Sequence, residues 1–215
     1  MHEAFLDSSI FWAFVGPERF EPDHNACVAI FARDDVRRYT SETVSSEVKQ
    51  SEDRRARLYS DLVAHLKLKR KLEEFDASRF SRHVADRARQ LVREIRGSEA
   101  DIEFLRQLGE FERARIRTAR SRIEKPLVRA KKDAYFEDLL RGALDIELGD
   151  ARVVTDYLFW APTHSDARFL TGDGKLLVKL RAGLARFLAA RYMAVPTVDD
   201  FLEPGRYVAG FLPSS

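Results

Sequence analysis

The order in which short apolar runs and amphipathic segments follow one another constrains the fold of this chain most. Residues 4–6 form an apolar run that stops at an acid, and residues 36–39 form a second short run with the character of a strand. Between these two runs, residues 10–16 and 24–32 are rich in apolar residues and favour helices. Strands that alternate with helices in this way indicate a parallel α/β sheet.

Two of the expected helices are preceded by hydroxyl side chains of the kind that cap helices. Ser8 and Ser9 stand before the first helix. Thr43 or Ser41 would cap the helix that follows the second strand and carries Glu47. A capping oxygen accepts a hydrogen bond from an otherwise unpaired amide of the first turn, so these residues predict where both helices begin.

The middle of the chain, from about residue 50 to about residue 141, contains no convincing strand. Apolar residues recur there at helical spacing, and Pro126 ends the pattern. We therefore expect residues from about 52 to 132 to form a charged helical insertion, either a helical hairpin or a small bundle. The amphipathic segments cover residues 58–72, 83–95 and 102–123.

The α/β pattern resumes after a helix at about residues 131–144. Asp150 stands before a further helix as its expected N-cap, and the apolar run at residues 166–170 has the character of a strand. We therefore expect a three-layer α/β/α fold around a central parallel sheet, with its core at about residues 1–50 and 134–215. The last expected elements are a helix over residues 174–190, a short final strand, a turn at Pro196 and a closing helical turn.

Charge is unevenly distributed along the 215 residues, whose formal net charge is +2. Residues 51–132 contain 23 Lys and Arg against 14 Asp and Glu, whereas the remainder contains 14 against 21. Such a basic middle segment suggests an anionic partner, although a solvated helical face would have the same composition.

The sequence carries few signals of compartment. The single cysteine, Cys27, excludes an internal disulfide and fits a reducing environment, so we expect a cytoplasmic protein. No apolar run approaches the length of a membrane span, and residues 1–11 lack the pattern of a signal peptide.

Four acids occupy equivalent places in the predicted elements. Asp7 ends the first strand, Glu47 lies in the first turns of the helix after the second, Asp150 opens a helix and Asp173 ends a later strand. Strand ends and helix starts of a parallel sheet meet at one edge, where such carboxylates would repel each other unless a cation bound them. Oxygen ligands suit Mg²⁺ or Mn²⁺. Each acid also has a simpler explanation, as a turn residue, a solvated residue or a helix cap.

Metal ions held by carboxylates can bind a phosphodiester, activate an attacking water and stabilise the leaving oxygen. Hydrolysis of this kind would leave a 5′-phosphate and a 3′-hydroxyl. Ser9 and Thr171 each lie two residues from an acid, Asp7 and Asp173 respectively. Their hydroxyls could orient a carboxylate or contact a phosphate.

The stretches FLDSSIF, TSETVSSEV, LGDARVV and FLTGDGKLL together resemble the motifs of PIN-domain nucleases, in the same order and on the same elements. The ending VPTVDDFL resembles the last strand and closing turn of that family. The match covers about residues 1–50 and 134–205 and leaves out the basic middle. The resemblance implies a doubly wound parallel sheet, catalysis by the four acids with Mg²⁺ or Mn²⁺, and RNA as substrate. It also implies a dimer, and an antitoxin protein as partner where the family member is a toxin.

The sequence departs from the family pattern after the last acid. The family often has a further acid there, whereas this chain has Lys175. Asp156 could compensate, but it lies six residues after Asp150 and would point away from it on a helix, so we expect a surface or secondary residue.

Three arginines of the basic middle, Arg113, Arg117 and Arg120, fall on one helical face and could track an RNA backbone. The alternative is an assembly element whose arginines pair with nearby glutamates, which are Glu103, Glu110 and Glu112. The chain could therefore be a metal-dependent ribonuclease, a catalytically inactive nucleic-acid-binding module, or an assembly protein. A nucleotide-binding protein is disfavoured because no glycine-rich loop follows the first strand.

Overall fold

The chain divides into two compact units, which we describe separately. The α/β unit comprises residues 1–47 and 118–215, and the helical unit comprises residues 48–117. The computed structural model describes residues 2–17, 21, 23–164, 166–191, 193 and 200–209, without the side chains of residues 82 and 83. The predicted turn at Pro196 lies outside these residues.

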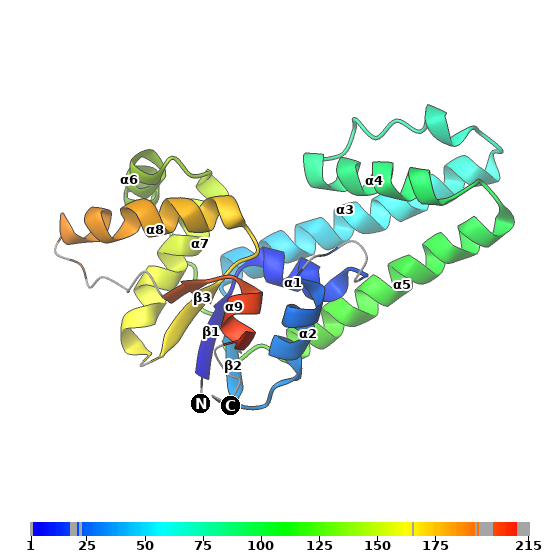
Figure 1. Cartoon of the computed structure of the whole chain (residues 1–215). Helices are drawn as coiled ribbons and strands as arrows, with labels where there is room; N and C mark the ends of the chain where they lie inside the picture. The colour runs from blue at the N-terminus through cyan, green and yellow to red at the C-terminus, as the bar shows by residue number, and fades with distance from the viewer. Residues whose placement is uncertain are drawn as a thin grey trace. The chain divides into compact units, whose positions relative to one another are not determined.

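The α/β unit contains a four-stranded sheet in the order β2-β1-β3-β4, and every pair of neighbours is parallel (Figure 1). The predicted parallel sheet is therefore confirmed. The strands are β1 (His2–Leu6), β2 (Val36–Tyr39), β3 (Ala167–Leu170) and β4 (Phe201–Leu202). The closing helical turn expected after Pro196 does not include residues 201–202, because Phe201 pairs with Phe169 of β3 and is buried.

Six helices of the α/β unit pack in two groups. In one group α2 contacts both α1 and α9, and in the other α6 contacts both α7 and α8. The helices are α1 (Ser8–Val15), α2 (His24–Ala32), α6 (Ala134–Leu144), α7 (Leu148–Trp160), α8 (Gly174–Ala189) and α9 (Pro204–Ala209). A short 3₁₀ turn, Ala161–Thr163, follows α7.

An aromatic cluster joins one face of the sheet to α7. Phe5, Phe169 and Phe201 stand in register on β1, β3 and β4, and all three are fully or almost fully buried. Tyr157 of α7 packs against each of them, with ring centroids 5.2–5.6 Å apart. Burial of such rings supplies much of the hydrophobic stabilisation of a small sheet and holds α7 in place beneath it.

The outer edge of β2 is covered by residues 122–132, which we call the strap. The Glu124 amide donates to the Arg38 carbonyl at 2.8 Å, and the Val128 amide donates to the Thr40 carbonyl at 3.0 Å. Val128 also forms a parallel bridge with Ser41, which lies just beyond the end of β2. The strap thus pairs part of an edge that would otherwise present free backbone groups, and it runs toward the carboxyl end of the sheet.

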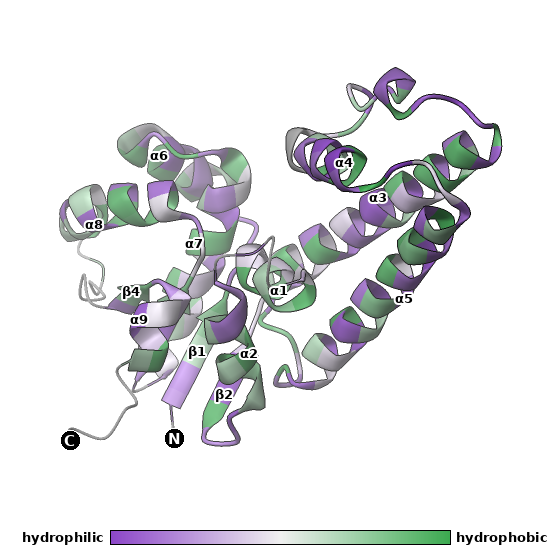
Figure 2. Cartoon of the chain, turned by 45° about the vertical axis from the view of Figure 1, so that its right-hand side comes forward, coloured by the Kyte–Doolittle hydropathy of each residue, from purple (hydrophilic) through white to green (hydrophobic). Residues whose placement is uncertain are grey.

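The helical unit is built from α3 (Glu42–Lys67), α4 (Arg82–Glu94) and α5 (Glu99–Ser121), of which α3 and α5 cross its boundaries along the chain. Hydrophobic and hydrophilic residues alternate along α3 and α5 in Figure 2. The buried side chains that form its core include Leu58, Leu62, Leu91 and Leu105. The predicted absence of strands between about residues 50 and 141 holds for every described residue there, apart from the single bridge of Val128. That this segment is an insertion over about residues 52–132 stays a prediction.

Candidate functional site

The predicted site residues lie at the carboxyl edge of the sheet, around the junction of β1 and β3. The chain leaves β1 toward β2 on one side and later returns to add β3 on the other, so the strand order reverses between these two strands. Open α/β sheets bind ligands in the crevice at such a position. Asp7 follows β1, and Thr171 and Asp173 follow β3.

Asp7 is held rigidly by its surroundings. Its amide donates to the Leu170 carbonyl of β3 at 3.0 Å. Its Oδ1 accepts from the Ser8 amide at 2.6 Å, which makes Asp7 the N-cap of α1 in place of the expected serines. Its Oδ2 accepts from the hydroxyls of Ser9 at 2.8 Å and Thr171 at 2.7 Å. The carboxylate therefore has one orientation, fixed by groups from both sides of the junction.

The hydroxyls of Ser9 and Thr171 lie where they can orient a carboxylate, because both donate to Asp7. Each hydroxyl has one proton, which it donates to Asp7, and each accepts a backbone amide in return. The Gly172 amide donates to Ser9 Oγ at 2.8 Å, and the Asp173 amide donates to Thr171 Oγ1 at 3.0 Å. The loop after β3 is thereby tied to the residues after β1.

Asp173 was expected to end a strand. It instead lies three residues beyond β3 and is the N-cap of α8. Its Oδ1 accepts from the amides of Lys175 at 2.8 Å and Leu176 at 3.0 Å. Its second oxygen makes no hydrogen bond to the described residues. Since Asp173 is exposed, that oxygen remains accessible to a ligand.

Asp150 is not a helix cap, because α7 begins at Leu148 and places Asp150 in its first turn. Burial raises the pKa of Asp150 to about 6, and the charges of Asp7 and Asp173 add to the rise. The helix start therefore lies one turn earlier than the sequence suggested, and Asp150 faces two of the other acids.

Glu47 lies in the second turn of α3, and its Oε1 would stand 3.5 Å from a Cβ added at Gly149. Burial raises its pKa to about 7, the charges of Asp7, Asp150 and Asp156 add to the rise, and a hydrogen bond from Ser8 opposes it. These interactions connect Glu47 with the other acids, so the structure brings all four predicted residues to one edge.

Asp156 was expected to be a surface or secondary residue, and the surface alternative was wrong. It is only 2% exposed, because residues on every side of α7 between Val153 and Leu158 are buried. Its Oδ1 accepts the Lys131 amide of the strap at 2.8 Å. Its Oδ2 is buried and has no hydrogen-bond partner among the described residues. A buried unpaired carboxylate oxygen is costly and indicates a missing ligand, proton or water.

The donor set suits a hard divalent cation in chemistry and charge. Its oxygens come from carboxyl groups, and in two of them, Glu47 and Asp150, burial and the charge of Asp7 raise the pKa. Among the described residues, however, no three Asp, Glu, His or Cys side chains stand in an arrangement that could hold a metal ion. Ligation would thus require rotation of side chains such as Glu47 and Asp150 around the fixed Asp7.

Two further polar residues lie at this edge: Ser8, which the sequence suggested only as a helix cap, and Asp23, which was not singled out. Ser8 donates through its hydroxyl to Asp7 at 3.4 Å and also hydrogen-bonds Glu47. Asp23 precedes α2 without capping it, and its Oδ2 would lie 3.3 Å from a Cβ added at Gly172. Burial and the charge of Glu203 raise the pKa of Asp23. Only the sheet brings these residues near the acids, and no spacing in the sequence signals it.

The predicted RNA-binding arginines lie on α5 at the spacing of one helical face. Arg113 donates through Nε to the Gly109 carbonyl at 3.1 Å, and Arg117 is exposed. Arg120 belongs to the α/β unit and the other two belong to the helical unit. Of the glutamates proposed to pair with them, Glu112 instead pairs with Arg55 at 3.2 Å and Arg87 at 3.5 Å.

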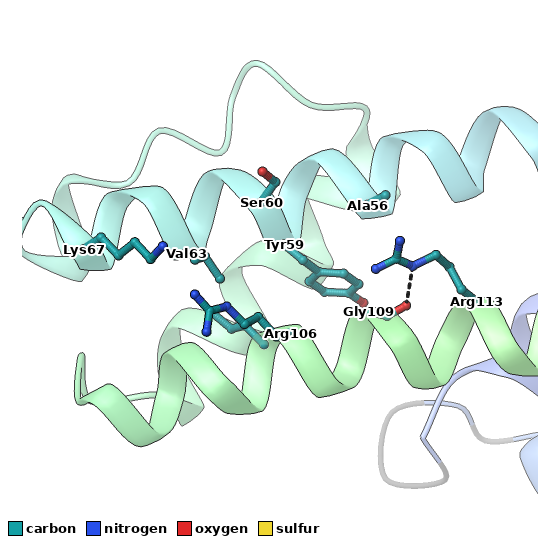
Figure 3. Close-up of a pocket in the computed structure, with 9 residues that line it drawn as sticks. Ala56, Tyr59, Ser60, Val63, Lys67, Arg106, Gly109 and Arg113 are labelled. Atoms are coloured by element: carbon teal, nitrogen blue, oxygen red, sulfur yellow. Dashed lines mark hydrogen bonds between the residues drawn. The ribbon is translucent and has the colours of Figure 1, made fainter.

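The helical unit contains a separate cavity of about 260 Å³ between α3 and α5, shown in Figure 3. Tyr59 and Lys67 line it from α3, and Arg106 and Arg113 line it from α5. None of the four predicted acids lines this cavity, so it is distinct from the carboxyl edge of the sheet.

No family model matches the chain, and neither a curated protein nor a solved structure matches it. In the part of the chain that the structure describes, no helix is both long and apolar enough to cross a membrane.

Proposed function

We propose that this protein is a metal-dependent endoribonuclease with a PIN-like, three-layer α/β/α domain. The observation that carries the proposal is the gathering of Asp7, Glu47, Asp150 and Asp173 at the point where the strand order reverses. The four motifs that resemble PIN-domain nucleases support it, because the elements carrying them are present in the same order. An antitoxin protein and a dimeric assembly remain proposals that rest on the resemblance alone.

Asp7, Glu47, Asp150 and Asp173 would hold Mg²⁺ or Mn²⁺, and bound metal would supply the Lewis acidity that activates water and stabilises a leaving oxygen. Asp7 offers a preorganised carboxylate, because Ser9 and Thr171 fix its orientation. Near neutral pH, Glu47 and Asp150 each hold a proton for part of the time in the metal-free protein. Cation binding would displace those protons from the two carboxyl groups.

The deciding experiment is calorimetric titration of Mn²⁺ into the metal-free protein near pH 6, in two buffers with different ionisation enthalpies. We expect binding that releases between one and two protons, because Glu47 is mostly protonated there and Asp150 about half. Asp7→Asn and Asp173→Asn should both lose it. Asn caps helices as well as Asp does, so the second variant keeps the start of α8.

A matched control is Asp133→Asn, which alters an Asp that caps α6 through a 3.0 Å bond from the Phe136 amide. This variant should bind Mn²⁺ as the wild type does. Cleavage of a labelled RNA with Mn²⁺ should follow the same pattern, with Asp7→Asn and Asp173→Asn inactive. Wild-type cleavage by both variants would show that the site is assigned to the wrong residues.

The alternative is a catalytically inactive PIN-like module that binds nucleic acid or mediates assembly. The absence of a ready metal-ligand arrangement among the described residues favours it, as does Lys175 in place of a further acid. RNA binding that is independent of Mg²⁺, without cleavage and without proton-coupled Mn²⁺ binding, would support this alternative.

A further inference from the structure

The strap, residues 122–132, is the most basic exposed segment of the α/β unit. It carries five basic residues and a single acid, Glu124, and all six are exposed. The five basic residues are Arg122, Lys125, Arg129, Lys131 and Lys132. Such a density of like charge on an extended segment repels itself, so it needs either close anchoring or a partner of opposite charge.

The anchoring comes from the backbone of the strap and leaves the basic side chains outside. Beyond the bonds to β2, the Ala130 amide donates to Glu42 at 3.2 Å and the Lys131 amide donates to Asp156 at 2.8 Å. Lys132 adopts a left-handed backbone conformation with φ of 47°. These bonds carry the strap from β2 to the side of α7, where Asp156 lies six residues beyond Asp150.

The basic side chains of the strap are largely uncompensated. Within the described residues, Lys125, Arg129, Lys131 and Lys132 make no ion pair. Arg122 lies 3.5 Å from Asp34, but that carboxylate is 96% exposed and the pair is weak. The charges therefore remain available to an external anion.

Two exposed aromatic rings accompany the basic end of the strap. Tyr135 lies in the first turn of α6, three residues after Lys132, and is 76% exposed. Phe159 of α7 is 40% exposed, and the Lys131 ammonium lies 4.3 Å from the centre of its ring. Basic groups interleaved with exposed rings form the pattern that binds single-stranded nucleic acids, since phosphates pair with the former and bases stack on the latter.

We propose that the strap and Tyr135 form a binding track for single-stranded RNA along the side of α7, on the same unit that carries the acids of the carboxyl edge. Arg129, Lys131 and Lys132 contact phosphates, Tyr135 stacks with a base, and Asp156 positions the track by holding the Lys131 amide. This proposal deepens the proposed function and rests on it for the identity of the ligand. An acidic protein would need the same charges but would have no particular use for an exposed tyrosine ring.

The test measures binding of a fluorescent single-stranded RNA of about 12 nucleotides by anisotropy, in EDTA and over a range of salt concentrations. The strap variant is Arg129→Ala/Lys131→Ala/Lys132→Ala. Its control, Lys69→Ala/Arg70→Ala/Lys71→Ala, removes the same charge from an exposed segment of the helical unit.

Loss of three phosphate contacts should make the fall of log K with log salt less steep, by about 2 in slope. It should also weaken binding by at least tenfold at low salt. The control should have a much smaller effect. Tyr135→Ala should weaken binding about tenfold, whereas Tyr135→Phe keeps the ring and should bind as the wild type does. Unchanged thermal unfolding of each variant establishes that the fold is intact.

Equal losses in the strap variant and its control would overturn the proposal, because they would reflect net charge alone. A loss confined to Arg113→Ala/Arg117→Ala would assign RNA to α5 instead, and no RNA binding by the wild type would also reject the track. EDTA prevents cleavage, so binding and cleavage are measured separately. If RNA binds through the strap in EDTA but is not cleaved in Mn²⁺, only the proposed function is rejected. Cleavage that survives in the strap variant at the wild-type KM would reject only the track.

Discussion

Replacement of Glu47 by Gln should stabilise the metal-free protein at alkaline pH while abolishing metal binding. The pKa of Glu47 rises from its ordinary value of 4.5 to about 7 in the folded protein. The folded state therefore holds the proton more tightly than the unfolded state, and stability falls as pH rises between these two values. Gln mimics the protonated side chain and escapes this loss.

The size of the effect follows from the pKa. One pKa unit corresponds to about 1.36 kcal/mol, so a rise from 4.5 to about 7 corresponds to at most about 3.4 kcal/mol. Glu47 is only partly buried, and solvent screening reduces the expected gain to roughly 1–2 kcal/mol. For a chain of this length, this corresponds to an increase in Tm of roughly 2–8 °C.

The assay is urea unfolding of both proteins in EDTA at about pH 5 and about pH 8. At the lower pH the two should be nearly equally stable, and at the higher pH Glu47→Gln should be the more stable. Excess Mn²⁺ should stabilise the wild type at the higher pH and leave the variant unchanged. A variant that is less stable than the wild type at about pH 8 would refute the view that burial and the neighbouring acids raise the pKa of Glu47.

Paired substitutions at three residues test individual contacts. Thr171→Val removes the hydroxyl that bridges Asp7 and the Asp173 amide, so the free energy of unfolding should fall by about 1–3 kcal/mol, whereas Thr171→Ser should lose much less of it. Equal losses in urea unfolding would mean that the methyl group contributes as much to stability as the hydroxyl does, and would contradict the bridging role. Asp173→Ala should cost about 1 kcal/mol through loss of the α8 cap and Asp173→Asn only a few tenths, and equal stability of the two would remove the capping role. Asp156→Ala should speed hydrogen exchange at the Lys131 amide while Asp156→Asn retains protection, and unchanged exchange in both would show that Asp156 does not anchor the strap.

The local pattern of residues was enough to predict many elements of the α/β unit. The helix at residues 24–32 and the strand at residues 36–39 have the predicted bounds, because apolar spacing and turn residues lie within the segments themselves. The parallel direction of the sheet followed from the alternation of strands and helices. Ser41 indeed caps α3, with its Oγ accepting from the Val44 amide at 3.3 Å.

Errors arose where a residue's surroundings come from distant parts of the chain. Asp150 has the composition of a cap, but α7 starts at Leu148. Asp156 was expected to be a surface or secondary residue because of its angle around the helix. In the structure α7 is surrounded by the sheet aromatics and the strap, so little of its circumference faces solvent. Angular position alone does not decide burial when several sides of a helix are covered.

By itself, the sequence determined the alternation of strands and helices and the four acids that follow them, because these depend on residues only a few positions apart. Tertiary structure alone decided that Thr171 donates to Asp7 across a separation of 164 residues, and that the strap covers β2 and ends at Asp156. Such contacts arise from the order in which strands pair, and strand order depends on packing summed over the whole sheet rather than on any one segment.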